Sequence, residues 1–496
     1  MCRTMDSRAL LTVPLTLTLI VGVAAEVAGA HPAGAGESTD DRDRIEWGDC
    51  QHTKEGDDEA FAGAQCAELE VPVDHADPDG ATLTLSLLRI PASGADDDRI
   101  GALLVNPGGP GATARRFAAD LGRRLPEAVQ ARFDVIGVDP RGTGASALDC
   151  GYDVADLLGA DPVVGSEAEA NELVEVHRDY VDACQAEAGD LLPHLGTRDA
   201  ARDLDAVRAA LGDDQVTYVG FGYGATLGQT YAQLFPERVR GLVLDGGVPL
   251  GASGVQLAHD QAVGLERILA AFAQSCNAQP DCPASPDALG AVNELMARAQ
   301  QDPVPAEPRD LGMGELETGL ALPLRDESRW EDLAFAVEAA LLGNGTRLVG
   351  MADQYIDHAN VDLSYAVNCL DLAWPTGPEG PAELLAAATA AEVDAPRFGD
   401  PATNQYLPCT MWPVAADPLT PGGPLPDSAA APLVVATTGD PATPLDGPAA
   451  LAQQLGGALL THDGTGHPIV GEDLDCVDDA VAAYLVDLEL PTTNCL

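Results

Sequence analysis

The chain is short of positive charge, and lysine is almost absent. Lysine and arginine together number 26 among 496 residues, and the single lysine is Lys54. Aspartate and glutamate number 79, which gives a formal net charge of −53. Such a surface repels phosphate groups, so we expect no nucleic-acid partner and no stable association with a membrane.

Beyond its N-terminus the sequence lacks long apolar runs. No stretch after residue 30 approaches the ~20 apolar residues that a membrane-spanning helix needs. The beginning of the chain has the layout of a signal peptide instead. Arg3 and Arg8 precede an apolar run over residues 10–23, and Ala-Gly-Ala at 28–30 offers a cleavage site. A membrane anchor is the alternative, which the shortness of the run disfavours. We therefore expect a signal peptide over residues 1–30 and a secreted protein.

The cysteines lack the spacing of metal-binding motifs. No two of them form CxxC and no histidine cluster accompanies them, so we expect no metal site. Cys2 lies in the predicted signal peptide and leaves an even set of ten, which favours disulfide bonds in an exported chain. Spacing alone does not fix their pairing. The ten are Cys50, Cys66, Cys150, Cys184, Cys276, Cys282, Cys369, Cys409, Cys476 and Cys495.

Short apolar segments alternate with longer amphipathic ones over much of the chain. Two strands are expected first, at 66–73 and 82–90, with a turn between them. The later short runs are separated mostly by long amphipathic stretches, a pattern typical of βαβ units and of a parallel sheet buried on both faces. These runs lie at 102–105, 133–138, 216–220, 242–244, 433–436 and 458–460.

One long region interrupts this alternation. Residues 250–425 are helical in pattern, irregular and rich in Pro, Ala and Asp, which indicates an inserted cap or lid. We therefore predict an α/β fold with a mostly parallel sheet flanked by helices and a largely helical cap. A flexible leader is expected at 31–47, and the core is expected in two parts, 48–249 and 426–496.

A glycine stands where the pattern predicts a catalytic nucleophile. The segment YVGFGYGATLG, residues 218–228, leaves a predicted strand and opens a helix. Gly220 and Gly224 flank position 222 as the tight turn of a nucleophile elbow requires, but that position holds Gly222 instead of serine. A dinucleotide-binding loop is the alternative. Its third glycine comes one residue too early for GxGxxG, so we expect no cofactor.

Two other loops could complete a catalytic site. NPGGPGA at 106–112 follows a predicted strand, and its glycines allow backbone N–H groups to approach a substrate carbonyl; a plain turn is the alternative. Asp440 follows another predicted strand, and His467 comes 27 residues later. Ser, Asp, His is the chain order of α/β-hydrolase triads. Gly222, Asp440 and His467 therefore occupy that order with the first member missing.

These motifs resemble those of one family. Over nearly all of its predicted mature length, the chain is similar to secreted bacterial tripeptidyl aminopeptidases and the related proline iminopeptidases, which have the α/β-hydrolase fold. The matching segments are NPGGPGA at 106–112, DPRGTGAS at 139–146, TRDAARDLDAVRAALG at 197–212, GATLGQTYAQLFPERV at 224–239, VNCLDLAWP around Cys369, PCTMWPV around Cys409, and TTGDPATPLDGPAALAQQL, GTGHP and CVDDAVAAYLVDLELP near the C-terminus.

The resemblance implies a reaction and a set of site residues. It implies that short peptides are released from free N-termini through an acyl-serine, with His467 as base and Asp440 as its partner. The N–H groups of Tyr223 and of Gly109 or Gly108 would form the oxyanion hole. The ligand would be a peptide or a small acyl compound, and we expect a monomer. The implied disulfides are Cys50–Cys66, Cys150–Cys184, Cys276–Cys282, Cys369–Cys409 and Cys476–Cys495.

Gly222 separates family membership from catalysis. Glycine has no Oγ, so no ester intermediate can form at this position, and loss of a triad nucleophile typically lowers kcat by about 10⁶. The hydroxyls of Thr226 and Ser146 are expected to lie in the wrong places to replace it. Three hypotheses remain: a hydrolase with impaired or absent activity, a non-catalytic protein that binds peptides or acyl ligands, and a purely structural exported protein, which the retained cleft motifs disfavour. Arg141 is expected to anchor its own loop, and the other histidines, His177 among them, to lie at the surface.

Overall fold

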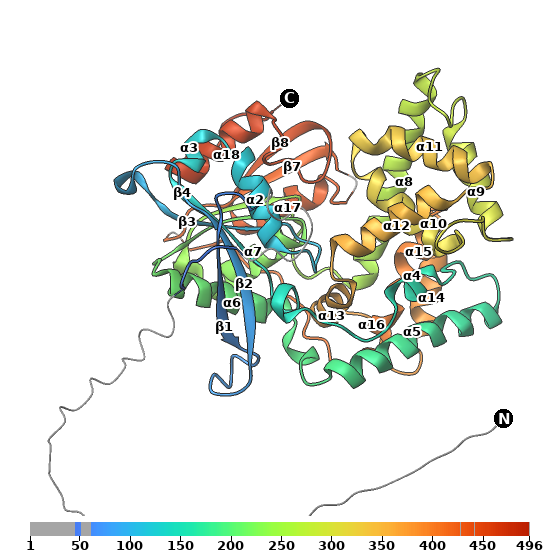
Figure 1. Ribbon diagram of the computed structural model, residues 1–496, viewed down its shortest axis with the longest axis horizontal. Helices are drawn as coiled ribbons and strands as arrows, with labels where there is room; N and C mark the ends of the chain where they lie inside the picture. Colours follow the sequence, from blue (N-terminus) through green and yellow to red (C-terminus); the bar gives the residue numbers. More distant parts are fainter. Residues whose placement is uncertain (1–44, 51–60, 427, 441, 496) are drawn as a thin grey trace, which may run out of the picture. The chain divides into compact units, whose positions relative to one another are not determined.

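The computed structural model describes residues 45–50, 61–426, 428–440 and 442–495 (Figure 1). They belong to one compact unit that spans Asp43–Leu496. The predicted signal peptide and most of the predicted leader lie outside the described residues. Within the described part of the chain, no helix combines the length and the apolar character that crossing a membrane requires.

An eight-stranded sheet runs through this unit, in the order β1-β2-β4-β3-β5-β6-β7-β8. The β1–β2 and β2–β4 pairs are antiparallel, and the pairs from β4 to β8 are parallel. The predicted fold class, a mostly parallel sheet with antiparallel strands first, is confirmed. The strands are β1 (Gln65–Pro72), β2 (Thr82–Ile90), β3 (Gly101–Asn106), β4 (Phe133–Val138), β5 (Val216–Phe221), β6 (Val239–Asp245), β7 (Leu433–Gly439) and β8 (Ala458–Thr465).

Helices cover both faces of the sheet. Side chains alternate along a strand, so Leu103 and Val105 of β3 pack on one face while Leu104 packs on the other. Because helices shield both faces of the sheet from solvent, the central strands are apolar at nearly every position. The first face carries α2 (Ala114–Arg124), α3 (Glu127–Gln130) and α18 (Asp475–Asp487); the second carries α6 (Thr197–Leu211), α7 (Tyr223–Leu234) and α17 (Asp446–Leu455).

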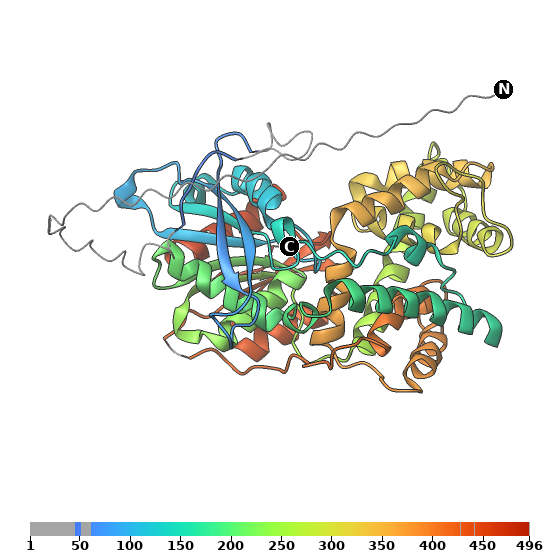
Figure 2. The same ribbon diagram turned by 60° about the horizontal axis from the view of Figure 1, so that its bottom comes forward.

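The chain between β6 and β7 is helical and has a hydrophobic core of its own. Its helices gather on one side of the sheet together with α4 and α5, which come from earlier in the chain (Figures 1 and 2). Leu157 of α4 and Tyr180 of α5 share a cluster with Leu363 and Leu384. The elements are α4 (Val154–Gly159), α5 (Glu167–Ala188), α8 (Gly254–Ala278), α9 (Ala288–Ala299), α10 (Met313–Leu324), α11 (Trp330–Leu341), α12 (Thr346–His358), α13 (Val361–Asp371), α14 (Gly380–Ala391), α15 (Gly399–Asn404) and α16 (Leu407–Thr410).

The packing of α4 and α5 bears on the predicted domains. The prediction assigned both helices to the core segment 48–249, yet they pack against the inserted helices. The boundaries of a cap at 250–425 remain a prediction.

All five disulfide bonds that the resemblance implied are present. Cys369–Cys409 joins α13 to α16, and Cys150–Cys184 joins the chain before α4 to α5, so two of the bonds tie the helical part together. The other three are Cys50–Cys66, Cys276–Cys282 and Cys476–Cys495.

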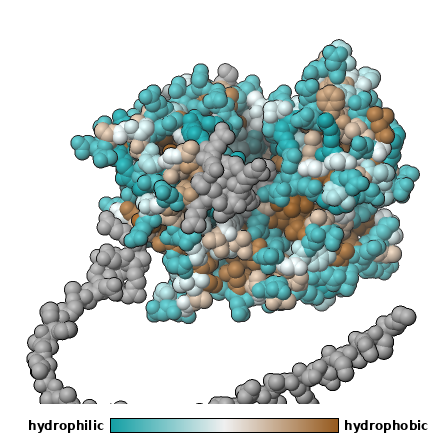
Figure 3. Space-filling view, in the orientation of Figure 1, coloured by the Kyte–Doolittle hydropathy of each residue, from teal (hydrophilic) through white to brown (hydrophobic). Residues whose placement is uncertain are grey.

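The face drawn in Figure 3 is mainly hydrophilic, with separate hydrophobic patches. Among the large apolar side chains of the described residues, Leu342 and Val393 are the most exposed, at 83% and 84%. Both belong to the helical segment between β6 and β7, and single exposed apolar side chains of this kind are ordinary on soluble proteins.

Candidate active site

Gly222 forms a sharp turn between β5 and α7. Its backbone has φ 53° and ψ −112°, and its N–H donates to the carbonyl of Asp245 over 2.9 Å. Its own carbonyl accepts from Ala225 over 2.9 Å, which begins the helix. This φ lies in the left-handed region that favours glycine, and any other residue there costs about 1–3 kcal/mol. The strand, turn and helix have the shape of a nucleophile elbow, and glycine fits that shape without strain.

The neighbouring glycines are required by space. A Cβ at Gly220 would lie 2.3 Å from the carbonyl oxygen of Gly224, and a Cβ at Gly224 would lie 2.4 Å from that of Asn106. These are backbone atoms that cannot move aside. The packing therefore agrees with the expectation that the tight turn requires small residues on both sides of position 222.

His467 and Asp440 form a hydrogen-bonded pair. Nδ1 of His467 donates to Oδ2 of Asp440 over 2.8 Å. The carboxylate is buried, with 8% of the residue exposed, and it also accepts the N–H groups of Ala442 and Thr443 and the hydroxyl of Thr443, each over 2.7 Å. Four donors thus hold Asp440 in place, and Asp440 in turn orients the imidazole.

The other nitrogen of His467 faces position 222. A Cβ built on Gly222 would lie 3.1 Å from Nε2 of His467; apart from the adjoining backbone, this ring alone among the described residues comes within 4 Å of it. A serine side chain here would meet the imidazole directly, after the ring retreats by a few tenths of an ångström. The structure therefore brings Gly222, Asp440 and His467 together in the arrangement of a triad that lacks its nucleophile.

The loop NPGGPGA lies against the elbow. A Cβ at Gly108 would lie 2.3 Å from the carbonyl oxygen of Phe221, so the loop and the turn touch through their backbones. The N–H of Gly108 donates to Oδ1 of Asn106 over 2.9 Å and is therefore not free for a substrate. Of the two predicted alternatives, this favours Gly109; that Gly109 and Tyr223, at the first position of α7, donate to an oxyanion stays a prediction.

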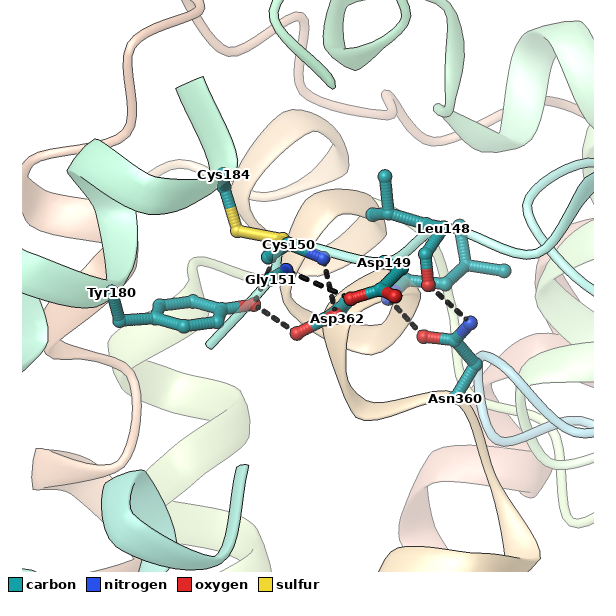
Figure 4. The surroundings of a disulfide bond; sticks show 9 residues. Leu148, Asp149, Cys150, Gly151, Tyr180, Cys184, Asn360 and Asp362 are labelled. Atoms are coloured by element: carbon teal, nitrogen blue, oxygen red, sulfur yellow. Dashed lines mark hydrogen bonds between the residues drawn. A yellow bond between two sulfur atoms is a disulfide. The ribbon is translucent and has the colours of Figure 1, made fainter. Parts of the chain in front are cut away.

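Two residues from other elements hold this loop and the start of α2 in place. Oδ1 of Asp139, just after β4, accepts the N–H groups of Ala114 and Arg115 over 2.8 and 3.0 Å. From the inserted segment, the N–H of Asn360 donates to the carbonyl of Gly111 over 2.9 Å. Nδ2 of Asn360 also donates to the carbonyl of Leu148 over 2.8 Å (Figure 4).

The start of α13 is held at a second point. Asp362 accepts the N–H of Cys150 over 2.9 Å and the hydroxyl of Tyr180 over 3.0 Å, beside the Cys150–Cys184 disulfide (Figure 4). Cys150, Cys184 and Asp362 lie close enough together to suggest a metal site. Because the two sulfurs are bonded to each other, they offer no thiolate to a metal ion.

Comparisons with known proteins fit this geometry. Residues 101–326 match the family described as alpha/beta hydrolase fold, and residues 395–495 match the family described as TAP-like protein. The chain is 34% identical to serine protease Hip1 of Mycobacterium tuberculosis over 91% of this chain and 90% of that protein. It is 35% identical to carboxylesterase B of the same species over 98% and 97% of the two chains. Identity to tripeptidyl aminopeptidase of Streptomyces lividans is 31%, over 93% and 86%.

The chain belongs to the TAP-like α/β-hydrolase family. Relatives of this family thus include proteins named as peptidases and one named as an esterase. All of these names describe hydrolysis of an acyl bond, for which an elbow, a histidine–carboxylate pair and oxyanion donors are the usual means.

Asp245 is a site residue of this TAP-like chain that the sequence analysis did not assign. It ends β6, and its Oδ2 accepts the N–H groups of Ile469 and Val470, each over 2.8 Å. These residues directly follow the His467–Pro468 pair, so Asp245 positions the histidine loop. Burial raises the pKa of Asp245 to about 6, against the lowering effect of the two N–H donors. The sequence signal that could have identified Asp245 is its place at the C-terminal end of a predicted strand, where α/β proteins carry functional groups.

The backbone beside His467 is also constrained. A Cβ at Gly246, which follows Asp245, would lie 2.4 Å from Cε1 of His467. Only glycine lets β6 end directly beneath the imidazole. The histidine is thus set by Asp440 on one side and by the end of β6 on another.

Tyr223 connects the elbow to the inserted helices. Its hydroxyl donates to Oγ1 of Thr197 over 2.7 Å, and Thr197 donates its own hydroxyl to Asp371 of α13. Burial raises the pKa of Asp371 to about 7. Since the phenol is engaged in this network, it is not a replacement nucleophile.

The structure agrees with the predictions for Ser146 and Arg141 and contradicts the one for His177, while that for the Thr226 hydroxyl stays a prediction. Ser146 donates its hydroxyl to the carbonyl of Thr143 over 3.2 Å, within its own loop. Arg141 is buried and binds both oxygens of Asp203 over 2.7 and 2.6 Å, which anchors its loop as expected. His177 was expected at the surface but is buried in α5, where burial lowers its pKa to about 4. Its Nδ1 donates to the carbonyl of Leu173 over 2.8 Å, a neighbour one turn away that replaces water.

Proposed function

We propose that this chain is an exported, peptidase-like member of its family that binds short peptides by their N-terminal portion and hydrolyses them poorly or not at all. The observation that carries the proposal is the His467–Asp440 pair, whose Nε2 lies 3.1 Å from the place of a Cβ at Gly222. In this proposal Asp440, His467 and the oxyanion donors Gly109 and Tyr223 are retained, and only the nucleophile is missing. Export is supported by the five disulfides.

Residual hydrolysis would have to use water directly. Water oxygen would bond to the substrate carbonyl carbon and pass a proton to Nε2 of His467. The C–N bond would then break, and the leaving nitrogen would take that proton. Gly109 and Tyr223 would stabilise the oxyanion through their N–H groups. Enzymes that lose a triad member retain about 10³–10⁴ over the uncatalysed reaction from binding and the oxyanion hole.

A non-catalytic binding protein is the second candidate, and Gly222 itself favours it. Glycine at φ 53° avoids the strain that a serine pays at an elbow, so a chain that only binds gains stability from the change. The same loops would then hold a peptide or an acyl ligand without turning it over.

The test compares the natural protein with Gly222→Ser, using Gly222→Ala as the matched control that adds a Cβ without an oxygen. Tripeptidyl, aminoacyl and simple ester chromogenic substrates cover the reactions named among the relatives. We expect Gly222→Ser to raise kcat by about 10⁴–10⁶, Gly222→Ala to raise it not at all, and His467→Ala to abolish the gain.

Other outcomes separate the two candidates. If no variant turns over but short peptides bind, the non-catalytic protein is supported. If the natural protein already matches Gly222→Ser, and His467→Ala leaves both unchanged, the proposed site is wrong.

A further inference from the structure

A small cavity lies directly beside the loop that carries Asp440. Its volume is about 230 Å³. Its lining comes from the ends of β7 and β8, from the chain after β7 and from α8 of the inserted segment. The lining residues of interest are Arg267, Ile268 and Ala271 on α8, and Thr438, Leu445 and Thr465 from the other elements.

The position of the cavity relates it to one part of a substrate. His467 stands between Gly222 and Asp440, while the oxyanion donors Gly109 and Tyr223 lie on the Gly222 side. In acyl transfer the histidine hands its proton to the leaving nitrogen, so the leaving portion must extend along the histidine loop. Because the cavity is walled by Asp440 and by Thr465, two residues before His467, it lies on that side. This step rests on the proposed function.

Arg267 supplies the one positive charge among the residues that line this cavity. Within the described part of the chain, no ion pair or hydrogen bond engages its guanidinium, and it is exposed. Asp440 does not compete for it, since four donors already satisfy that carboxylate. A free arginine in a chain with a net charge of −53 is suited to bind one carboxylate through two parallel hydrogen bonds.

The other polar side chains restrict what can bind. Thr438 and Thr465 donate their hydroxyls to Asp463 and Glu327 over 2.9 and 2.8 Å, so neither is left to bind an anion. Asp446 is exposed and also lines the cavity. The carboxylates of Asp463, Glu327 and Asp446 repel negative charge on a ligand. An anionic group is therefore favoured only where it contacts Arg267 directly. The volume is below the roughly 300–1,000 Å³ of pockets for drug-sized ligands, so a single amino-acid residue is a suitable occupant.

We propose that Arg267 determines specificity by binding the free C-terminal carboxylate of a one-residue leaving group. The substrates would then be short peptides that end one residue beyond the scissile bond, such as tetrapeptides for a tripeptidyl site, and long polypeptides would bind less well. Ile268, Ala271 and Leu445 would contact the side chain of that last residue.

The test measures binding to the natural Gly222 protein, so that turnover does not interfere. Titration calorimetry compares three peptides. Tetra-alanine acid places its C-terminal carboxylate one residue beyond the scissile bond, tetra-alanine amide lacks that carboxylate, and hexa-alanine acid carries it two residues further along the chain. We expect the tetrapeptide acid to bind about 10- to 100-fold more tightly than either of the others, as for a hydrogen-bonded charge. Arg267→Gln should remove this preference by weakening the acid alone. Arg347→Gln, an exposed arginine on α12, is the matched control and should change nothing.

Three results overturn the proposal. Equal affinity for acid and amide in the natural protein means that the protein does not recognise the C-terminal carboxylate. An acid preference that survives Arg267→Gln assigns it to another residue. Binding of none of the peptides contradicts the proposed function as well, whereas binding of all with equal affinity contradicts only the role of Arg267.

Discussion

Two buried carboxylates of this protein have almost the same exposure and opposite surroundings. Asp245 at the end of β6 is 2% exposed, and Glu317 in α10 is 5% exposed. Asp245 accepts two backbone N–H groups, whereas neither oxygen of Glu317 has a hydrogen-bond partner among the described residues. Burial raises the pKa of both, that of Asp245 to about 6 and that of Glu317 well above its usual range.

The charged neighbours of Glu317 deepen the contrast. The groups that add to its raised pKa are the carboxylates of Asp161 and Asp400, which favour its neutral form. Oδ1 of Asp400 and Oδ1 of Asn404 on α15 also lack partners among the described residues. Polar groups of this kind are commonly satisfied by buried water. Burial alone therefore does not define the role of a carboxylate. Asp245 holds the histidine loop through two hydrogen bonds, whereas Glu317 holds no other segment among the described residues.

The largest expected effect comes from removing the carboxylate that has partners. Asp245→Ala leaves the N–H groups of Ile469 and Val470 buried and unpaired, which should lower the free energy of unfolding by about 2–5 kcal/mol. Urea denaturation at pH 4 measures this, because Asp245 is then neutral in the native state and little of its pH-dependent stability has been lost. Asp245→Asn keeps an acceptor of the same shape and should stay within about 1 kcal/mol of the natural protein. Equal losses in the two variants would show that the hydrogen bonds are not the cause.

The second prediction concerns pH. Folding raises the pKa of Asp245 from 3.8 to about 6, so the native state holds a proton that the unfolded state has released. The resulting stability is complete below about pH 4 and is lost as pH rises through about 6, and it amounts to about 3 kcal/mol. Unfolding free energies of the natural protein and of Asp245→Asn should therefore lie close together at pH 4 and diverge by pH 7.5, with the natural protein losing about 3 kcal/mol relative to the variant. Parallel curves would contradict this.

The smallest effect should have the opposite sign. Glu317→Leu removes two unpartnered buried oxygens and should raise the free energy of unfolding at pH 7.5 by about 1–3 kcal/mol. Glu331→Leu, at an exposed position of α11, is the control and should stay within about 0.5 kcal/mol. A loss of stability in Glu317→Leu would mean that the carboxylate is engaged in solution and would remove the contrast with Asp245.

Sequence patterns predicted those parts of the molecule whose structure depends on neighbouring residues in the chain. The strand expected at 133–138 is β4, and the one expected at 82–90 is β2, because both are continuous or alternating apolar runs between breakers. The run at 242–244 predicted only the centre of β6, since Val239 and Arg240 extend a strand whose buried middle alone is purely apolar. Chain order and turn residues were enough to propose Gly222, Asp440 and His467.

Residues whose role depends on distant segments could not be predicted in this way. Arg267 gains its significance from facing a loop more than 170 residues later, and Glu317 from lying near Asp161 and Asp400. The burial of His177 follows from the packing of α5 against the inserted helices, which no pattern within α5 indicates. In each case the sequence shows a polar residue on a helix, and only tertiary packing decides whether water reaches it.

The hydrogen bond from Asn360 to Gly111 has a consequence for the evolution and engineering of such chains. A Cβ at Gly111 would lie 2.3 Å from the carbonyl oxygen of Asn360, so the loop and the start of α13 fit each other at the level of the backbone. The inserted segment is therefore not an interchangeable module. A chimera that takes this segment from a relative must take the 106–112 loop with it, because exchanging one without the other removes the support on which the Gly109 amide depends.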